Sequence, residues 1–321
     1  MLTMSKFMSV GQAQSYFEGE KGYYNNADND GTGHATIKGK LAAELLLHGI
    51  DGNTIHTHLT TADFEKISAM SDVLSEECVE GITSKLDKLS ELASLAGKNR
   101  RAGFDVQMGA PKELALLRAI MFAEGNLEMV AKIDAAVKDA ADASISEAEK
   151  MIGYRETKGK KTELIRGDGI IYNQIQHLLN RDGEVYLHYH HFIYNMIRTE
   201  DGSYRSIENE ILFKNQDFMH IFFHAALAKE LDKMGLEIEI TDPKKGTFKI
   251  LGIPEQAIRD YSRRTEAIEL LIAEEEKRIG RAMTQAEKQK FKLFHRPVKD
   301  KTLSAQIVQI ETAERLKMDY A

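Results

Sequence analysis

Residues 177–195 read HLLNRDGEVYLHYHHFIYN and carry the strongest strand signal in the chain. Aromatic and β-branched residues, which favour strands, crowd residues 184–197. The turn-forming sequence EDG follows at residues 200–202. We therefore expect residues 184–197 to form the first arm of a hairpin and residues 205–207 to begin its return arm.

Strand and helix signals alternate on both sides of this segment. A strand-like stretch at residues 103–109 leads into a helix that starts near Pro111. A second hairpin is expected where LEIEI and TFKIL flank a turn, at residues 236–251. Apolar residues recur with helical spacing through residues 39–95, 127–152, 208–234 and the charged stretch from residue 254 onward. This order predicts an α+β fold, with an antiparallel β-sheet layered with helices.

The composition is that of a globular protein. The chain has 321 residues, of which 42% are hydrophobic and 29% charged, enough apolar material for one large core or two smaller ones. The single cysteine, Cys78, excludes an intrachain disulfide framework and favours a reducing, cytoplasmic location. No apolar run approaches the roughly 20 residues that span a bilayer. We expect neither secretion nor membrane insertion.

The charges are unevenly distributed. The net charge of −7 argues, taken alone, against a partner as acidic as nucleic acid. Residues 277–301, however, contain nine Lys or Arg against two Asp or Glu, and a shorter basic cluster includes Lys158, Lys160 and Lys161. Such runs usually form a solvated face, but they also suit a DNA-binding surface. Charge alone leaves both interpretations open.

Histidines suggest a metal site in the aromatic strand. His188 and His190 are two residues apart, so both imidazoles should leave the same face of a sheet, while His191 should point the other way. His177 precedes His188 by eleven residues, and the polar sequence NRDGE between them can return the chain. Three imidazoles could then converge on one ion and leave coordination positions free for a substrate. Equally, these could be hydrogen-bonded histidines of an ordinary sheet.

Tyrosines supply a candidate nucleophile. Tyr16, Tyr23 and Tyr24 lie in a hydrophilic stretch rich in Gly, Asn and Asp, at residues 16–33, where a loop is expected. They could simply anchor that loop. A tyrosine hydroxyl can also attack phosphorus, but its ordinary pKa of about 10 means that a base or a cation must assist. Asp105 is a candidate for that task, or for orienting a metal-bound histidine, or it could be an edge residue facing water.

Taken in order, these motifs resemble the N-terminal relaxase domain of the large conjugative relaxase-helicases, the tyrosine HUH endonucleases of the MobF class. The resemblance spans nearly the whole chain and is carried by four segments: SYFEGEKGYY at residues 15–24, GFDVQMGAPKE at 103–113, HLLNRDGEVYLHYHHFIYN at 177–195 and DYSRRTEAIE at 260–269.

The helical region at about residues 71–95 matches this class poorly, and the chain also departs from the pattern at three short positions. Val185 and Tyr186 stand where the class usually has Pro-Gln, and Phe17 stands where a second tyrosine of the first pair is common. Glu113 follows the small-Ala-Pro-Lys signature and places an acid where DNA would approach. None of the three removes a candidate metal ligand.

The resemblance implies one relaxase domain over residues 1–321. Its catalytic palm would be a two-layer fold of a central antiparallel sheet covered by helices, at about residues 1–253. A helical, basic fingers region that embraces DNA would follow at about residues 254–321. No P-loop sequence occurs, so the helicase of this class is absent from the chain. We expect either a fragment of a longer relaxase-helicase or a short relaxase.

The resemblance also implies a role for each candidate residue. Tyr16 would be the primary nucleophile, and Tyr23 or Tyr24 the second. The remaining assignments are His177, His188 and His190 as metal ligands, Asp105 as the residue that assists the tyrosine or orients a ligand, Arg181 as a stabiliser of phosphate charge, and Lys112, Lys158, Lys160 and Lys161 as DNA contacts. On ligand chemistry, three imidazoles suit Mn, Co, Ni or Zn, whereas the class implies Mg or Mn.

The implied function is metal-dependent nicking and rejoining of one DNA strand at a plasmid origin of transfer, through a covalent 5′-phosphotyrosine, during conjugation. The implied partners are single-stranded DNA and the origin hairpin, accessory relaxosome proteins, the coupling protein and a type IV secretion apparatus. The location would be the cytoplasm of the donor cell, with transfer to the recipient. Two alternatives stay open: an origin-binding module that no longer cuts, and a tris-histidine metalloenzyme acting on a small molecule.

Overall fold

The computed structural model describes residues 2–9, 12, 36–41, 55–56, 101–201, 204–295 and 303–320. The expected tyrosine loop, and with it Tyr16, Tyr23 and Tyr24, lies outside these residues. So does almost all of the expected helical region at 39–95.

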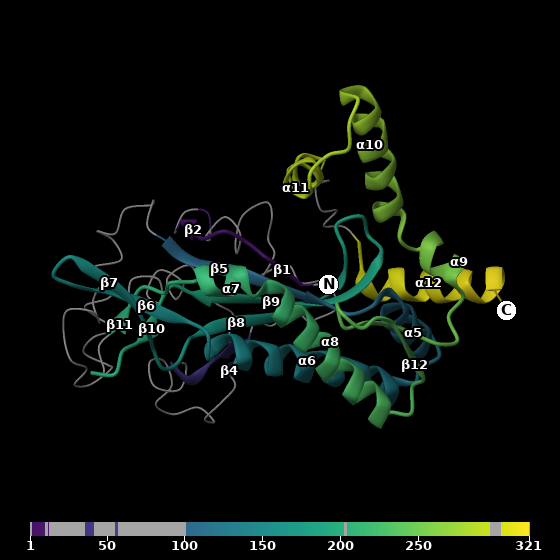
Figure 1. Cartoon of the computed structure of the whole chain (residues 1–321). Coiled ribbons are helices and arrows are strands. Elements are labelled where there is room, and N and C mark those ends of the chain that lie inside the picture. Colours follow the sequence, from purple (N-terminus) through teal and green to yellow (C-terminus); the bar gives the residue numbers. More distant parts are fainter. Residues whose placement is uncertain are drawn as a thin grey trace.

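A seven-stranded sheet with antiparallel pairing forms the centre of the molecule (Figure 1). Its strand order is β1-β5-β9-β8-β3-β4, and β2 also pairs with β5. The strands are β1 (Leu2–Met4), β2 (Met8–Ser9), β3 (Thr36–Lys38), β4 (Ile55–His56), β5 (Arg101–Gly109), β8 (Tyr172–Leu179) and β9 (Val185–Tyr194). The long strands β5, β9 and β8 are neighbours, so residues 177–195 lie at the middle of the sheet.

The hairpin predicted for residues 184–197 is wrong in its extent. Strand β9 pairs with β8 on one side and β5 on the other, and it ends at Tyr194. It ends there because the next residue, Asn195, turns its side chain to the backbone: Nδ2 donates to the carbonyl of Arg101 at 3.2 Å, and Oδ1 accepts from the N–H of Ile207 at 3.0 Å. Only the short β10 (Ile197–Arg198) and β11 (Tyr204–Arg205) form the expected hairpin.

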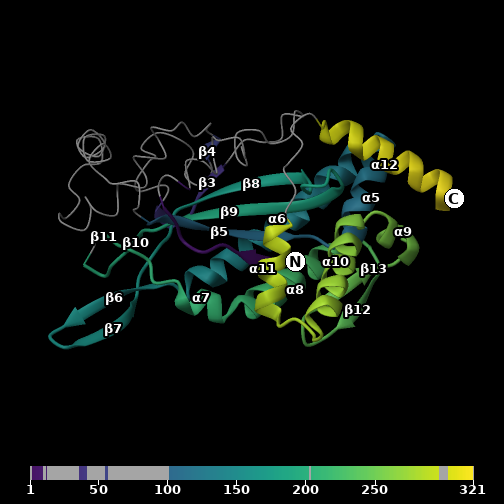
Figure 2. The ribbon, with the colours of Figure 1, turned by 90° about the horizontal axis from the view of Figure 1, so that it is seen from above.

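Two further hairpins lie outside the main sheet. Strands β12 (Ile238–Asp242) and β13 (Thr247–Ile250) confirm the one predicted around LEIEI and TFKIL. Strands β6 (Gly153–Lys158) and β7 (Lys161–Arg166) form a ribbon with Gly159, in the left-handed conformation at φ +67°, in its turn. This ribbon projects from the body of the molecule (Figure 2).

Helices cover one face of the sheet. The helices in this layer are α5 (Lys112–Ala123), α6 (Leu127–Glu149), α7 (Glu210–Lys214) and α8 (Gln216–Lys233). Alternate residues of β5, namely Phe104, Val106 and Met108, are fully buried between sheet and helices. The helix predicted for residues 208–234 is interrupted at Asn215, whose φ of −105° and ψ of 20° end α7 and begin α8.

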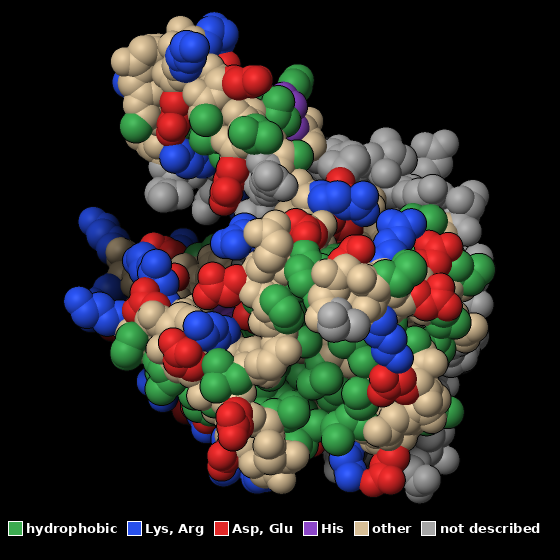
Figure 3. Space-filling model, turned by 90° about the vertical axis from the view of Figure 1, so that its right-hand side faces the viewer, with side chains coloured by type: hydrophobic (Ala, Val, Ile, Leu, Met, Phe, Trp, Pro, Cys, Tyr) green, Lys and Arg blue, Asp and Glu red, His purple; other side chains and the backbone are tan. Residues whose placement is uncertain are grey.

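The C-terminal part of the described chain is helical, as predicted. It contains α9 (Glu255–Asp260), α10 (Arg263–Ile279), α11 (Gln285–Phe294) and α12 (Ala305–Tyr320). Helix α12 packs on α5, whereas α10 and α11 stand away from the sheet and its helices (Figures 1 and 3). The α+β architecture with an antiparallel sheet and covering helices is thus confirmed.

Candidate active site

The turn between β8 and β9 places three histidines opposite one another. Asn180 builds this turn by accepting hydrogen bonds from the backbone N–H groups of Asp182 and Glu184, each at 2.9 Å, and Gly183 takes a φ of +73°. The resulting register pairs His177 directly with His188, and Ile175 with His190. Because paired residues share a face and side chains alternate along a strand, the three imidazoles leave the same face of the sheet.

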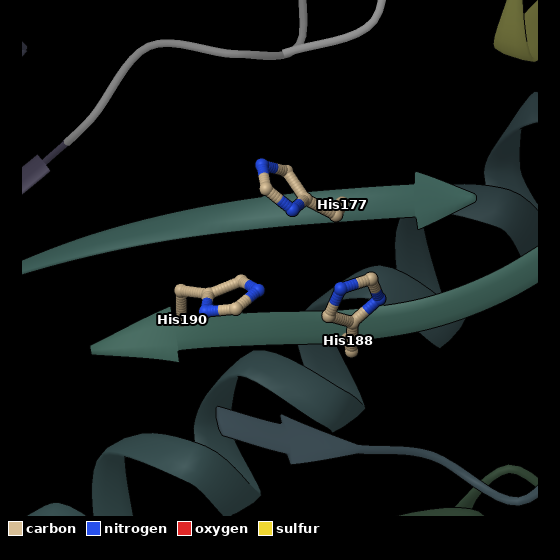
Figure 4. Close-up of side chains that lie close together, drawn as sticks. All are labelled: His177, His188 and His190. Atoms are coloured by element: carbon tan, nitrogen blue, oxygen red, sulfur yellow. The ribbon is translucent and has the colours of Figure 1, made fainter. Parts of the chain in front are cut away.

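The three rings form a nearly equilateral triangle (Figure 4). Their centroids are 5.2 Å apart for His177 and His188, 5.0 Å for His177 and His190, and 5.1 Å for His188 and His190. One potential ligand nitrogen from each ring lies within 4.8 Å of the other two, and all three side chains are buried. Within the described residues this is the only group of three or more His, Cys, Asp or Glu with such geometry.

Hydrogen bonds on the far side of two rings fix their tautomers. The Nδ1–H of His188 donates to the carbonyl oxygen of Tyr186 at 2.8 Å, because a carbonyl can only accept. The Nδ1–H of His190 donates to Oδ2 of Asp105 at 2.7 Å. Each ring then keeps its lone pair on Nε2, the atom needed for a metal bond. A carboxylate behind a histidine is the usual outer support of a metal ligand, so this donor set fits a divalent cation.

Asp105 is itself held by the N-terminal strands. Its backbone N–H donates to Oγ of Ser5 at 2.9 Å, and its carbonyl accepts from the N–H of Ser5 at 2.8 Å. Asp105 is buried, on the same face of the sheet as His190. The structure therefore contradicts the interpretation of Asp105 as an edge residue facing water.

His191 points to the opposite face, as predicted. Its Nδ1–H donates to the carbonyl of Val106 at 3.1 Å, and its Nε2 accepts from the amide of Gln174 at 2.9 Å. The same amide donates to Asp142 at 2.7 Å, and Asp142 also pairs with Lys38 at 2.6 Å. Burial, above all, lowers the pKa of His191 to about 4, so this ring is neutral at physiological pH. It belongs to a polar network beneath helix α6.

The remaining candidate residues lie at different places around the sheet. Arg181 is in the turn between β8 and β9, four residues after His177. Lys112 begins α5, and its Nζ donates to the carbonyl of Val185 at 2.9 Å; burial lowers its pKa to about 8. The structure brings Asp105 to the histidines, while Lys158 and Lys161 flank the turn of the β6–β7 ribbon and pair with carboxylates of that ribbon.

The basic stretch predicted at residues 277–301 is partly neutralised within its own helices. Arg281 pairs with Glu287 at 2.7 Å, and Lys288 pairs with Glu276 at 2.9 Å. Arg278 pairs with Glu275 at 2.6 Å. The visible face of α10 and α11 accordingly mixes basic, acidic and apolar side chains (Figure 3).

The sequence pattern did not predict two residues that lie near the site. The ring of Tyr186 stacks on His188, with centroids 4.7 Å apart and an angle of 26° between the planes. Its only signal was the departure from the Pro-Gln usual in the class. Glu184 is buried and accepts from Nδ2 of Asn180 and from the backbone N–H of Arg263, both at 2.9 Å. It ties the turn beside the histidines to the start of α10, a contact that no local pattern announces.

An antiparallel sheet that carries three convergent imidazoles, one of them backed by a carboxylate, is the arrangement of the HUH endonuclease class. The family model described as TrwC relaxase matches residues 10–318. The chain belongs to this family and is a relaxase, an enzyme that nicks DNA by transesterification. No curated protein matches its sequence significantly.

Solved structures share this fold over the full chain. The conjugative relaxase TrwC in complex with oriT DNA, in a metal-bound structure, has a TM-score of 0.72 and 23% identity, with 100% of both chains covered. The metal-free complex has a TM-score of 0.71 at the same identity and coverage. TrwC with a 27-mer DNA comprising the recognition hairpin and the cleavage site has a TM-score of 0.71 and 22% identity, over 99% of this chain and 98% of that one. Among the described helices, none combines the length and apolar character needed to cross a bilayer.

Proposed function

We propose that this relaxase nicks and rejoins one DNA strand at a plasmid origin of transfer, using a tyrosine nucleophile beside a divalent metal held by three histidines. The observation that carries the proposal is the triangle of buried imidazoles with Asp105 behind His190. TrwC, which shares the fold, has been captured with oriT DNA both with and without metal. Membership of the same family supports the same class of substrate here.

His177, His188 and His190 would hold the cation. A bound divalent cation would neutralise charge on the scissile phosphate and make its phosphorus a better electrophile. Mn, Co, Ni and Zn accept imidazole readily, whereas Mg prefers oxygen ligands. Of these metals, Mn is therefore the one that both accepts imidazole ligands and belongs to the pair, Mg or Mn, that the family implies.

The strand transfer would conserve the phosphoester bond. The hydroxyl oxygen of Tyr16 would bond to phosphorus while its proton passes to a base. The bond from phosphorus to the 3′-oxygen would break, and this oxygen would take a proton from the protonated base or from water to become a free 3′-hydroxyl. Attack by a 3′-hydroxyl on the phosphotyrosine reverses the step without ATP. Tyr23 or Tyr24 would perform a second transfer. The contact with His190 supports a role for Asp105 in orienting a ligand, and Arg181 would help to bind the phosphate.

DNA would also contact the ribbon and the C-terminal helices. Lys158, Lys160 and Lys161 lie at the tip of the projecting β6–β7 ribbon, where they can approach a phosphate backbone (Figure 2). Residues 254–321 would act as fingers on the palm formed by residues 1–253. Lys112 would contribute through the start of α5. Accessory relaxosome proteins, a coupling protein and a secretion apparatus would complete the assembly in the cytoplasm of the donor cell.

Trapping of the covalent intermediate tests the proposal. The protein is incubated with Mn²⁺ and a library of single-stranded oligonucleotides labelled at the 3′ end, because a 5′-phosphotyrosine retains the downstream fragment. Label should migrate with the protein on a denaturing gel, and it should be lost in Tyr16→Phe and His188→Ala. Tyr261→Phe, a tyrosine in the C-terminal helices, is the matched control and should retain the adduct.

Other outcomes would favour the alternatives. DNA binding without any adduct from the wild-type protein would indicate an origin-binding module that does not cut. Metal binding with neither adduct nor DNA binding would point to a metalloenzyme with a small-molecule substrate. Sequencing of the trapped DNA would identify the nick site.

A further inference from the structure

The imidazole of His188 has two contacts with a single residue, Tyr186. The two side chains lie on the same face of β9 because they are two residues apart. Their rings stack at 4.7 Å, and the backbone carbonyl of Tyr186 accepts the Nδ1–H of His188 at 2.8 Å. The ring centroids of His177 and His190 lie 5.2 and 5.1 Å from that of the same imidazole. Tyr186 therefore restrains the His188 ring in two ways: the stack limits the tilt of the ring plane, and the hydrogen bond limits rotation of the ring within that plane.

Gly109 provides the space in which the Tyr186 ring lies. It is the residue of β5 that pairs with His188. A Cβ atom built on Gly109 would lie 1.8 Å from the hydroxyl oxygen of Tyr186 and 2.4 Å from its Cζ. The backbone of Gly109 does not have a positive φ, so it does not itself require glycine. The need for glycine at this position comes from the tyrosine ring.

We propose that Tyr186 is a positioning residue for the metal centre. Its ring stacks on the imidazole of His188 and fixes the orientation of that ligand, and Gly109 leaves the space in which the Tyr186 ring lies. This inference rests on the metal site of the proposed function. An imidazole free to rotate about its side-chain bonds must be ordered when metal binds, which costs affinity. The stacked ring removes that freedom before the metal arrives. The aromatic ring does this and the hydroxyl does not, so Phe should replace Tyr at this position.

The assignment explains one departure of this chain from its class. The class usually has Pro-Gln before the first paired histidine, whereas this chain has Val185-Tyr186. A glutamine offers no ring to stack on the imidazole. We therefore expect the orientation of His188 to depend on an aromatic side chain in this protein, together with the missing Cβ at Gly109.

Titration with Co²⁺ tests the inference, because the visible absorption of Co²⁺ reports its coordination as well as its affinity. Tyr186→Phe should bind Co²⁺ within about twofold of the wild-type affinity and with the same spectrum. Tyr186→Leu and Gly109→Ala should each weaken binding by about tenfold or more, in the range typical for loss of an outer support of a ligand, and alter the spectrum. The double variant should be no weaker than either single variant, because both changes remove the same stacked ring.

Controls separate positioning from general damage. Phe218→Leu removes another aromatic ring, on helix α8, which belongs to the layer that covers the other face of the sheet, and should leave Co²⁺ binding unchanged. Gly109→Ala adds only a methyl group, and the atoms that it meets are the far end of the Tyr186 side chain, so the variant should fold.

Each contrary result has a distinct meaning. Wild-type affinity and spectrum in Tyr186→Leu and Gly109→Ala would refute the positioning role and leave the metal site standing. An equal loss in Tyr186→Phe and Tyr186→Leu would assign the effect to the hydroxyl and also refute it. Absence of Co²⁺ binding by the wild-type protein would overturn the metal site and the positioning role together.

Discussion

The carboxylate of Asp105 on β5 lies 2.7 Å from Nδ1 of His190 on the neighbouring strand β9. The two residues are not directly paired, since Asp105 faces Phe192 and His190 faces Gln107 in the register. The contact is diagonal, and both side chains are buried on the face that carries the other two histidines. The carboxylate thus contacts the candidate ligand through Nδ1 and not through Nε2, the nitrogen that would bind a metal.

Replacement of this carboxylate should weaken metal binding. In Asp105→Asn the side-chain oxygen can still accept the Nδ1–H of His190, but the negative charge that makes Nε2 a better donor is lost. We expect Mn²⁺ or Co²⁺ affinity to fall roughly tenfold, at the lower end of the range for such supports. Calorimetric titration measures the change.

A matched carboxylate serves as the control. Asp168 is exposed and pairs with Lys40 at 2.9 Å and Arg198 at 2.7 Å. Asp168→Asn should bind metal as the wild-type protein does. Unchanged affinity in Asp105→Asn would show that the carboxylate does not act through His190.

The sequence predicted the convergence of His177, His188 and His190 but not the surroundings of these histidines. The period-two pattern of a strand is enough to place His188 and His190 together, and a turn at NRDGE is enough to return His177 to them. The contact between Asp105 and His190 requires β5 to be the neighbour of β9, which is a matter of strand order. Local periodicity carries no information on strand order, so the role of Asp105 stayed open between alternatives.

The strand predicted for residues 184–197 is too long for the same reason, because contacts with other parts of the chain are not visible in a local pattern. The β-branched Ile197 extends the aromatic and β-branched run past Tyr194, so the pattern predicted one strand through residues 184–197. The strand ends where Asn195 finds backbone partners at Arg101 and Ile207, residues that are distant in the sequence. Tertiary hydrogen bonds of Asn195 therefore end the strand despite the local preference of this run for strand structure. The stacking of Tyr186 on His188 could not be predicted from the sequence either, because Gly109, which leaves space for the tyrosine ring, lies on another strand.

The lysines of the β6–β7 ribbon should contribute to the salt dependence of DNA binding. The triple variant Lys158→Ala, Lys160→Ala and Lys161→Ala removes three positive charges from the ribbon tip. If each contacts a phosphate of a duplex stem, the slope of log K against log salt should become shallower by about 0.9 per lysine, or roughly 2 to 3 in all. Fluorescence anisotropy with a labelled hairpin at several salt concentrations measures this slope.

The control removes the same charge elsewhere. Lys132 lies on α6, Lys150 directly follows that helix and Lys233 lies on α8, and each pairs with a nearby glutamate. Their triple alanine variant should leave the slope within about one unit of the wild-type value. Equal effects of the two triple variants would mean that net charge, rather than the ribbon, governs binding.

A buried ion pair joins α5 to α6 and should be important for stability. Arg118 donates from Nε and NH2 to the two carboxylate oxygens of Asp134, at 2.6 and 2.8 Å, and it also bonds to Gln309 of α12. The Arg118 side chain is 6% exposed. Asp134→Ala leaves this guanidinium without its main counter-charge, so we expect a loss of about 3 kcal/mol or more in the free energy of unfolding.

Urea denaturation measures that loss. Glu128→Ala is the control, because Glu128 pairs with Lys132 at an exposed position of the same helix. Because water screens exposed pairs of this kind, the loss of this one should change the stability little. A similar, small effect in both variants would contradict a special role for the buried pair.

His224 on α8 should make the fold sensitive to acid. Its side chain is buried beside Phe223, Phe248 and His220, and neither ring nitrogen has a hydrogen-bond partner among the described residues. Burial, above all, lowers the pKa of His224 to about 3. An unfolded histidine has a pKa of about 6.5. Between these values the unfolded chain binds a proton that the folded protein excludes, so stability is full above about pH 6.5 and falls as the pH drops towards 3.

The expected size of this effect follows from the two pKa values. Between pH 7 and 4.5 the His224 contribution should reduce the free energy of unfolding by about 2 to 3 kcal/mol, at 1.36 kcal/mol for each pKa unit. His224→Leu removes the titrating group and should flatten the wild-type pH dependence by that amount, as measured by urea denaturation at several pH values. His295→Gln changes an exposed histidine of the C-terminal helices and should retain the wild-type dependence. If His224→Leu and the wild-type protein lost stability in parallel, the acid sensitivity would have to arise from other groups, because the buried imidazole is the only feature that separates the two proteins.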